Sequence, residues 1–236
     1  FQKVNPSRVE IEKTNYFEKY SKNLENLFFN LRFPTELFNN KRIVDFGCGT
    51  GELDIFLGQQ GGFIKGYDFN KKALNRAKEL SKKFSLEQNV SFEYADLDIF
   101  ETHEEFDLAV SFGVIHHVPQ QEEFFNKMFN STKEGGYIIL GYSDSSGMIQ
   151  RLLQRELVYK YTDKSDIEIF KYAKKYFSEH VERSVKFGGR SRESVINDYL
   201  VNKHYDGISI QSINSWASSR KLKYYSSLPN IDLPFR

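Results

Sequence analysis

A glycine-rich turn is the first place along the chain where residue types and spacing suggest chemistry. Gly47, Gly49 and Gly51 follow a short apolar run in the segment VDFGCGTG. Glycines at such a turn let the backbone approach a ligand, and they aim amide N–H groups at its polar atoms. A dinucleotide site needs the spacing G-x-G-x-x-G, but Glu52 stands where its third glycine would be. The spacing therefore disfavours NAD or FAD, and it leaves open another ligand or a tight turn that binds nothing.

Acidic residues stand beside this turn and at the ends of the next two apolar segments. Asp68 ends the second segment, where its carboxylate can accept hydrogen bonds from both hydroxyls of a ribose. Asp96 follows the third, where it can accept from an adenine amino group while the backbone amide of Leu97 faces a ring nitrogen. Each acid alone is equally consistent with a helix cap or a solvated loop. Together with Asp45, they form a series of three acids at three consecutive strand ends, which predicts an adenosine site.

Alternating strand and helix patterns place these residues at one edge of a sheet. Apolar segments predict strands at residues 41–46, 63–67, 90–94, 106–112 and 137–142. Amphipathic spacing predicts helices at residues 52–60, 71–84, 122–129 and 209–222. This alternation is typical of an α/β fold with a doubly wound parallel sheet, in which ligands bind at the carboxyl ends of the strands.

The other segments flank or interrupt this core. Residues 1–40, with one or two helices over 9–32, are expected to form an N-terminal helical lid, and residues 41–147 the core. A cap is inserted at 148–206, helical as far as residue 177 and less regular from residue 180. Residues 207–236 then return to the core with the last helix and a sixth strand at 223–231. Gly135 and Gly136 are expected to form a turn before the fifth strand.

The motifs as a set resemble a known family. In order, VDFGCGTG, GYDFN, YADLD, FDLAVSFGVIHHV and KEGGYIIL cover residues 41–142, and they resemble class I S-adenosylmethionine-dependent methyltransferases of the small-molecule type, a type 11/12-like methyltransferase. The resemblance implies a Rossmann-like, seven-stranded-type sheet and S-adenosylmethionine as the cofactor, with S-adenosylhomocysteine as the product. The residues that it implies for cofactor binding are Asp45, Gly47, Cys48, Gly49, Gly51, Asp68, Phe69, Asp96, Leu97, Ser111 and Phe112.

Each part of the cofactor has its implied partners within this set. The loop around Gly47 and Gly49 would hold the methionine and ribose portions, with Asp45 ordering the loop. Asp68 would bind the ribose and Phe69 would pack on the adenine. Ser111 and Phe112 would face the methionine end.

Two adjacent histidines are the catalytic candidates. His116 and His117 come just after the fourth strand, where the methyl-bearing sulfur of the cofactor would point. Methyl transfer needs mainly positioning and, for a hydroxyl acceptor, removal of a proton, which a histidine can accept near neutral pH. We favour His117 over His116 as the general base. The alternative is that both histidines hold the loop through backbone hydrogen bonds. Without a cysteine or carboxylate at ligand spacing, they predict no metal site.

The inserted cap is the candidate substrate region. Positive charge gathers around Gly188 and Gly189, which suggests an acidic small molecule or, alternatively, a solvated loop balanced by nearby acids. In addition, Tyr16 and Tyr20 of the N-terminal segment are placed to close over the cofactor or simply to pack. The substrate candidates are Arg190, Arg192 and Tyr199 in the cap and Tyr16 and Tyr20 in the lid; Arg183, Lys186 and Lys203 add to the charge.

Composition bounds the remaining possibilities. The 236 residues carry a formal net charge of +1, so no global field draws the chain to nucleic acid or to an anionic membrane. The single cysteine, Cys48, agrees with a cytoplasmic location, and no apolar run reaches the roughly 20 residues of a membrane span. We expect O-methylation of a small molecule. The alternatives are a methyltransferase acting on RNA or protein, and a cofactor-binding domain without catalysis.

The ends of the chain suggest that it belongs to something larger. The sheet of the resembled family usually closes with a seventh, antiparallel strand, and the residues after Ile231 are too few to supply one. The chain also begins with Phe1 rather than methionine. We therefore expect a truncated chain or fused neighbouring domains; the alternative is a degenerate sheet edge. A homodimer is a further expectation for its partners.

Overall fold

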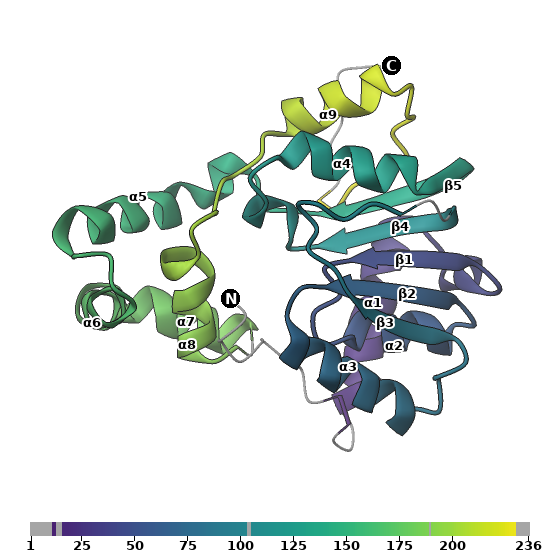
Figure 1. Cartoon of the computed structure of the whole chain (residues 1–236), viewed down its shortest axis with the longest axis horizontal. Helices are drawn as coiled ribbons and strands as arrows, with labels where there is room; N and C mark the ends of the chain where they lie inside the picture. The colour runs from purple at the N-terminus through teal and green to yellow at the C-terminus, as the bar shows by residue number, and fades with distance from the viewer. Residues whose placement is uncertain (1–10, 13–15, 103–104, 189, 230–236) are drawn as a thin grey trace.

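Five parallel strands form the centre of the molecule. The computed structural model describes residues 11–12, 16–102, 105–188 and 190–229. The strands run in the order β3-β2-β1-β4-β5, and every neighbouring pair is parallel. They are β1 (Arg42–Phe46), β2 (Phe63–Asp68), β3 (Val90–Tyr94), β4 (Phe106–Phe112) and β5 (Thr132–Gly141). The order reverses between β1 and β4, which is the point where doubly wound sheets bind ligands (Figure 1). This arrangement confirms the predicted α/β class.

Successive side chains of each strand point to opposite faces of the sheet. In β1, Ile43 packs with Phe28 and Phe56, whereas Val44 packs with Phe124 on the other face. Burying each of these side chains contributes about 1.5–3 kcal/mol, which fixes the helices against the strands. The first face is covered by α1 (Tyr16–Asn30), the 3-10 turn η1 (Thr35–Phe38), α2 (Glu52–Gln59) and α3 (Lys71–Lys83). The second face is covered by α4 (Gln121–Asn130) and α9 (Ile210–Ser219).

The inserted cap is a separate group of helices with its own apolar core. It comprises α5 (Ser145–Tyr161), α6 (Asp166–Tyr176), α7 (Ser178–Gly188), α8 (Arg192–Ile196) and the π-helical turn η3 (Asn197–Val201). Val158, Ile169, Val181 and Leu200 are buried together inside it. Figure 1 shows the cap beside the edge of the sheet at which β4 ends.

The chain enters and leaves the cap through two adjacent segments. Asp144 and Ile208 form a parallel bridge, and the Ser145 amide donates to the Ile208 carbonyl at 3.2 Å. The Cβ of any larger residue at Gly207 would lie 2.6 Å from the Cα of Ser145, so only glycine permits this approach. We refer to residues 143–145 and 207–208 as the neck.

Two expectations for the interior of the chain need correction. Residues 178–188 form a regular helix rather than irregular structure, because Phe177, Val181 and Val185 repeat at helical spacing and pack in the cap core. Gly135 and Gly136 lie within β5, not in a turn before it. There they fill a bulge between the pairs Phe106–Thr132 and Leu108–Tyr137.

The expected sixth strand is also wrong over its described part. Residues 223–229 form no strand, while Ile231 and the expected strand end lie outside the described residues. Side chains rather than backbone fix this segment: the Tyr225 hydroxyl donates to the Arg32 carbonyl at 2.6 Å, and its ring packs edge-on against Tyr137 at 5.5 Å. Among the described residues, no helix is long and apolar enough to cross a membrane.

Candidate functional site

The three glycines of the turn after β1 have positive φ angles but different surroundings. A Cβ at Gly47 would lie 2.3 Å from Val114, and one at Gly51 would lie 2.8 Å from Ala77, so these two glycines allow close packing. For Gly49, at φ +56°, no described residue other than its chain neighbours has an atom within 4 Å of the position its Cβ would take. The chain therefore uses two glycines to fold the turn tightly, and the third leaves an open backbone face on which a ligand can lie.

Asp68 fixes this turn from the end of β2. Its carboxylate accepts hydrogen bonds from the amide of Gly49 at 2.9 Å and from the amide of Asn70 at 2.7 Å. Asn70 in turn caps α3 by accepting from the amides of Lys72 and Ala73. Burial raises the pKa of Asp68, although the amides of Asn70, Gly49 and Phe69 oppose this shift. A carboxylate has room for further hydrogen bonds, so Asp68 can also accept from a pair of hydroxyls.

Two acids behind the turn are buried more deeply. Burial, with the nearby charge of Asp68, raises the pKa of Asp45 to about 8. Oδ1 of Asp45 and both carboxylate oxygens of Asp54 find no hydrogen-bond partner among the described residues. The sequence interpretation missed Asp54, since an acid in the first turn of a helix is ordinarily a solvated N-terminal residue. Both carboxyls lie where a cationic group of a ligand would be stabilised.

The residues expected at the adenine end of the cofactor follow β3, whose end lies next to Asp68. The amide of Ala95 donates to the Asp68 carbonyl at 3.0 Å, which brings the end of β3 beside the end of β2. Asp96 is exposed, Leu97 is buried and Phe69 is half-buried. The three acids at consecutive strand ends thus share one edge of the sheet.

Ser111 and Phe112 end β4 on the other side of β1. Ser111 is fully buried, and its hydroxyl donates to the Phe46 carbonyl at 2.8 Å. Phe112 is half-buried, and its ring lies where a Cβ at Gly141 would be. Cys48 is buried among apolar side chains, and burial raises the pKa of its thiol.

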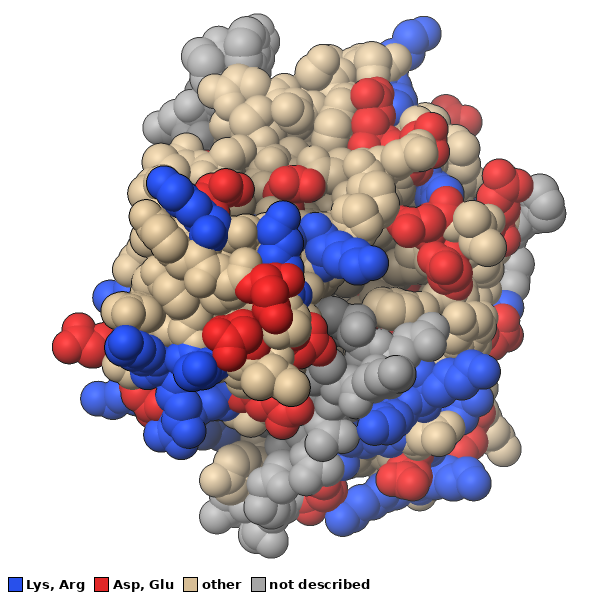
Figure 2. All heavy atoms as spheres, turned by 60° about the vertical axis from the view of Figure 1, so that its left-hand side comes forward, with Lys and Arg blue, Asp and Glu red and all other residues tan. Residues whose placement is uncertain are grey.

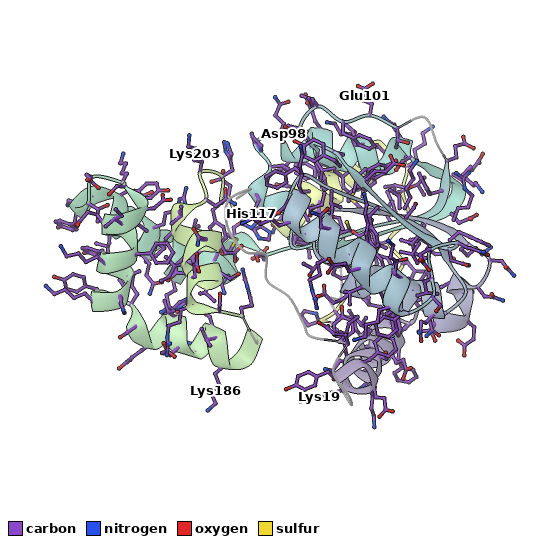
Figure 3. All side chains as sticks on the ribbon, turned by 60° about the horizontal axis from the view of Figure 1, so that its bottom comes forward. Lys19, Asp98, Glu101, His117, Lys186 and Lys203 are labelled. Atoms are coloured by element: carbon purple, nitrogen blue, oxygen red, sulfur yellow. The ribbon has the colours of Figure 1, made fainter. Side chains whose placement is uncertain are left out.

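His116 and His117 lie in a 3-10 turn (η2, Ile115–His117) directly after β4. Their rings are 4.2 Å apart, but their surroundings differ. Burial, and to a smaller extent the charge of His117, lowers the pKa of His116 to about 4, so that ring is neutral at pH 7. His117 faces the cap instead: Nε2 lies 3.0 Å from Oδ1 of Asp198, and Nδ1 lies 2.9 Å from the Asn202 amide nitrogen. Figure 3 shows His117 at the junction between core and cap.

Asp198 joins this histidine to an arginine. Its second carboxylate oxygen accepts from Arg190 at 2.9 Å. Burial opposes ionisation of Asp198, but the hydrogen bond from His117 and the charge of Arg190 together favour ionisation more strongly. The pKa of Asp198 is accordingly well below its usual range. The sequence interpretation missed Asp198 and Asn202 because more than 80 residues separate them from His117, and no local pattern marks such a contact. The described residues hold no cluster of three groups that would bind a metal ion.

The other candidate substrate residues are dispersed. Arg192 is exposed and pairs with Glu182, with one contact at 2.9 Å. Figure 2, which brings the cap side forward, shows Lys and Arg interleaved with Asp and Glu rather than in one basic field. Tyr16 is exposed, whereas Tyr20 packs against α2 and α3 residues. Burial and then the charges of Glu52, Asp54 and Asp45 raise the pKa of Tyr20, which places it near the buried acids.

S-adenosylmethionine fits the residues present at this edge. The open face of Gly49 and the ordered carboxylate of Asp68 suit a ribose, and the buried acids Asp45 and Asp54 suit a cationic amino acid portion. A site of this kind at the switch point agrees with the location that the fold favours.

Comparisons with known proteins agree with this site. Residues 37–190 match the family model of a methyltransferase domain. The chain is 29% identical over 102 residues to the ubiquinone biosynthesis O-methyltransferase of Pseudomonas fluorescens, covering 42% of each chain. It is 28% identical over 102 residues to the 27-O-demethylrifamycin SV methyltransferase of Amycolatopsis mediterranei, covering 42% of this chain and 38% of the relative. The matched region is thus less than half the length of these curated relatives.

A solved structure extends the similarity of the fold beyond the matched sequence. PKMT2 from Rickettsia typhi, in complex with AdoHcy, superposes with a TM-score of 0.61 at 16% identity. The superposition covers 87% of this chain and 46% of that one. At this identity it shows a shared fold, which includes much of the region outside residues 37–190.

Proposed function

We propose that this chain, which belongs to the methyltransferase domain family matched by residues 37–190, transfers the methyl group of S-adenosylmethionine to a hydroxyl oxygen of a small molecule. The observation that carries the proposal is the Asp68 carboxylate, ordered by the amides of Gly49 and Asn70 beside an open glycine face. The O-methyltransferases among the relatives support the choice of oxygen as the acceptor atom.

The residues of the site divide the binding of S-adenosylmethionine between them. Asp68 would accept hydrogen bonds from the ribose, while Asp96 and the amide of Leu97 would contact the adenine beside Phe69. Asp45, through the atom that is unpartnered among the described residues, would accept a hydrogen bond from the methionine ammonium, whose positive charge favours ionisation of this carboxyl when the cofactor binds. The bound cofactor supplies a methyl group already activated on a sulfonium, so the protein mainly positions the acceptor and handles its proton.

His117 is the proposed proton acceptor. In the neutral ring whose Nε2–H donates to Asp198, Nδ1 carries the lone pair and accepts from the Asn202 amide. The His204 carbonyl oxygen, 3.1 Å from Nδ1, becomes the hydrogen-bond acceptor once Nδ1 is protonated. An acceptor hydroxyl that displaces this amide can give its proton to Nδ1. Asp198 then stabilises the resulting imidazolium, as the acid of a catalytic triad does. Asp198 and Arg190 act as positioning residues because they reach the substrate only through His117.

Cofactor binding and turnover test the two halves of the proposal separately. Calorimetry should show binding of S-adenosylmethionine and S-adenosylhomocysteine. Mass spectrometry of a metabolite extract treated with the protein should show a product heavier by one methyl group. With that acceptor, His117→Gln should lower kcat by about 100-fold or more while the Kd for the cofactor stays near wild type.

A matched control is Lys186→Gln, since Lys186 is exposed and points away from the junction in Figure 3. It should leave kcat and Kd unchanged. If a folded protein binds neither form of the cofactor, the proposed function is wrong. Unchanged turnover in His117→Gln would reject only the role of the histidine.

A further inference from the structure

Arg151 lies at the inner side of α5 with little to neutralise its charge. It is half-buried, its Nη1 donates to the Tyr205 hydroxyl at 2.9 Å, and its guanidinium lies 5.7 Å from the centre of the Tyr199 ring. Within the described chain, no carboxylate lies at ion-pair distance from it. Asp198 contributes to its electrostatic environment but is already bound by His117 and Arg190.

Arg155, one turn further along the same helix, is an example of an arginine whose hydrogen bonds stabilise the cap. Arg155 is 8% exposed and donates to three backbone carbonyls, those of Tyr199 at 3.2 Å, Leu200 at 3.4 Å and Lys203 at 2.8 Å. Its hydrogen-bonding capacity is well used inside the protein. Arg151, by contrast, makes one side-chain hydrogen bond to the described residues, which leaves donors of its guanidinium for a ligand.

Buried polar atoms without a partner lie in the row of rings that includes the two tyrosines in contact with Arg151. Tyr199 is 1% exposed, yet its hydroxyl has no hydrogen-bond partner among the described residues, and the same holds for Nε2 of His180 and Nδ1 of His116. Ring contacts join them: His180 lies 5.5 Å from Tyr199, Tyr199 lies 6.3 Å from Tyr205, and Tyr205 lies 5.6 Å from His116. A buried polar atom left without a partner is costly, so three of them along one row of rings point to a polar ligand.

The electrostatics of this cluster favour an anion. Burial lowers the pKa of both histidines, and the positive charge of Arg151 contributes to both shifts. Neutral histidines and tyrosines add hydrogen-bond donors without adding negative charge. The cluster thus offers one cation, at least one hydroxyl donor and aromatic walls, which suits a planar carboxylate.

We infer that Arg151, Tyr199 and Tyr205 form a subsite for a carboxylate of the methyl acceptor. This inference rests on the proposed function and deepens it. Tyr205 lies between Arg151 and the proposed proton acceptor His117: its hydroxyl accepts from Arg151, and the centre of its ring is 5.5 Å from that of His117. The acceptor is accordingly a hydroxy acid whose hydroxyl and carboxylate are about one tyrosine side chain apart.

The test compares an acid with its uncharged amide. Protein saturated with S-adenosylhomocysteine is titrated with 4-hydroxyphenylacetate or 4-hydroxyphenylacetamide, and the ring C–H signals of the histidines are followed by NMR. The acid should bind at least ten-fold more tightly than the amide and should shift the signals of His116 and His180. Arg151→Met should abolish this preference. Arg192→Met should keep it, since Arg192 is exposed and paired with Glu182.

Tyr199→Phe provides a second variant that keeps the buried ring and removes only a hydroxyl. It should weaken binding of the acid several-fold without lowering the melting temperature. Equal binding of acid and amide, binding of neither, or an unchanged preference in Arg151→Met would overturn the subsite and leave a water-filled cluster. The Kd for S-adenosylhomocysteine is measured on the same samples, so failure of cofactor binding is distinguished from failure of the subsite.

Discussion

The core and the cap hold their buried carboxylates in different ways. Asp68 in the core accepts from two backbone amides, those of Gly49 and Asn70, whose positions follow from the path of the chain. Asp198 in the cap is held by two side chains, those of His117 and Arg190, which come from different elements. A backbone clamp survives most substitutions around it, whereas a side-chain clamp is lost when either partner changes. The proposed cofactor half thus depends mainly on the path of the backbone, whereas the proposed acceptor half depends on side chains that substitution can change.

Removing the carboxylate of Asp68 should have the largest effect. Asp68→Ala loses the clamp on Gly49 and the acceptor for the ribose. Two hydrogen bonds to a charged group contribute about 1.5–3 kcal/mol each, so the Kd for S-adenosylmethionine should rise by about 100-fold or more. Asp98→Ala is the matched control, because Asp98 is an exposed acid in the segment that follows β3. Calorimetry on the folded Asp68→Ala variant measures this Kd. A Kd near that of wild type would show that the Asp68 carboxylate does not hold the cofactor.

His116 predicts how stability depends on pH. Its pKa is about 4 in the folded protein, below the roughly 6.5 of an unfolded histidine, because burial disfavours its charged form. The unfolded chain therefore binds the additional proton first, and the free energy of unfolding should fall by about 1–3 kcal/mol as pH drops from 6.5 to 4. Asp45, whose pKa is raised to about 8, acts in the opposite sense because it is protonated on folding.

The difference between wild type and His116→Asn isolates the histidine. Urea denaturation at several pH values should show the advantage of wild type shrinking below pH 6.5. A difference that stays constant with pH would mean that His116 does not titrate as its burial indicates.

The effects of substituting His117 and Asp198 on the free energy of unfolding should be coupled. His117 and Asp198 are 15% and 13% exposed and 3.0 Å apart, so Asp198→Asn and His117→Gln should each lower the free energy of unfolding by about 1–2 kcal/mol. The double variant should lose clearly less than the sum, with a coupling of about 1 kcal/mol. Additive losses in urea denaturation would show that the two residues stabilise the junction independently.

The smallest effect is expected at the exposed pair of the cap. Arg192 and Glu182 are open to solvent, where ion pairs contribute little to stability. Arg192→Ala should leave the melting temperature unchanged, whereas Arg190→Ala should lower it because Arg190 binds Asp198. Equal losses in the two variants would remove the distinction between a buried clamp and a surface pair.

The cofactor edge was predictable because its signals are local. Asp45, Asp68 and Asp96 each come at the end of an apolar segment, and parallel strands bring such ends together. The proposed acceptor side was not predictable from the sequence. Asp198, Asn202 and Arg151 are brought to the junction with the core only when the cap folds. The expected sixth strand failed for a related reason. Its described part is held by the hydroxyl and ring of Tyr225 rather than by a strand partner.

The neck, where the two ends of the cap lie side by side, should allow the cap to be exchanged. The chain leaves the core at Ser145 and returns at Gly207, where the two segments touch and share a hydrogen bond between Ser145 and Ile208. An insertion whose ends adjoin behaves as a cassette, because exchanging it leaves the path of the remaining chain unaltered. Grafting a different cap between these two positions would combine a new acceptor preference with the same cofactor half.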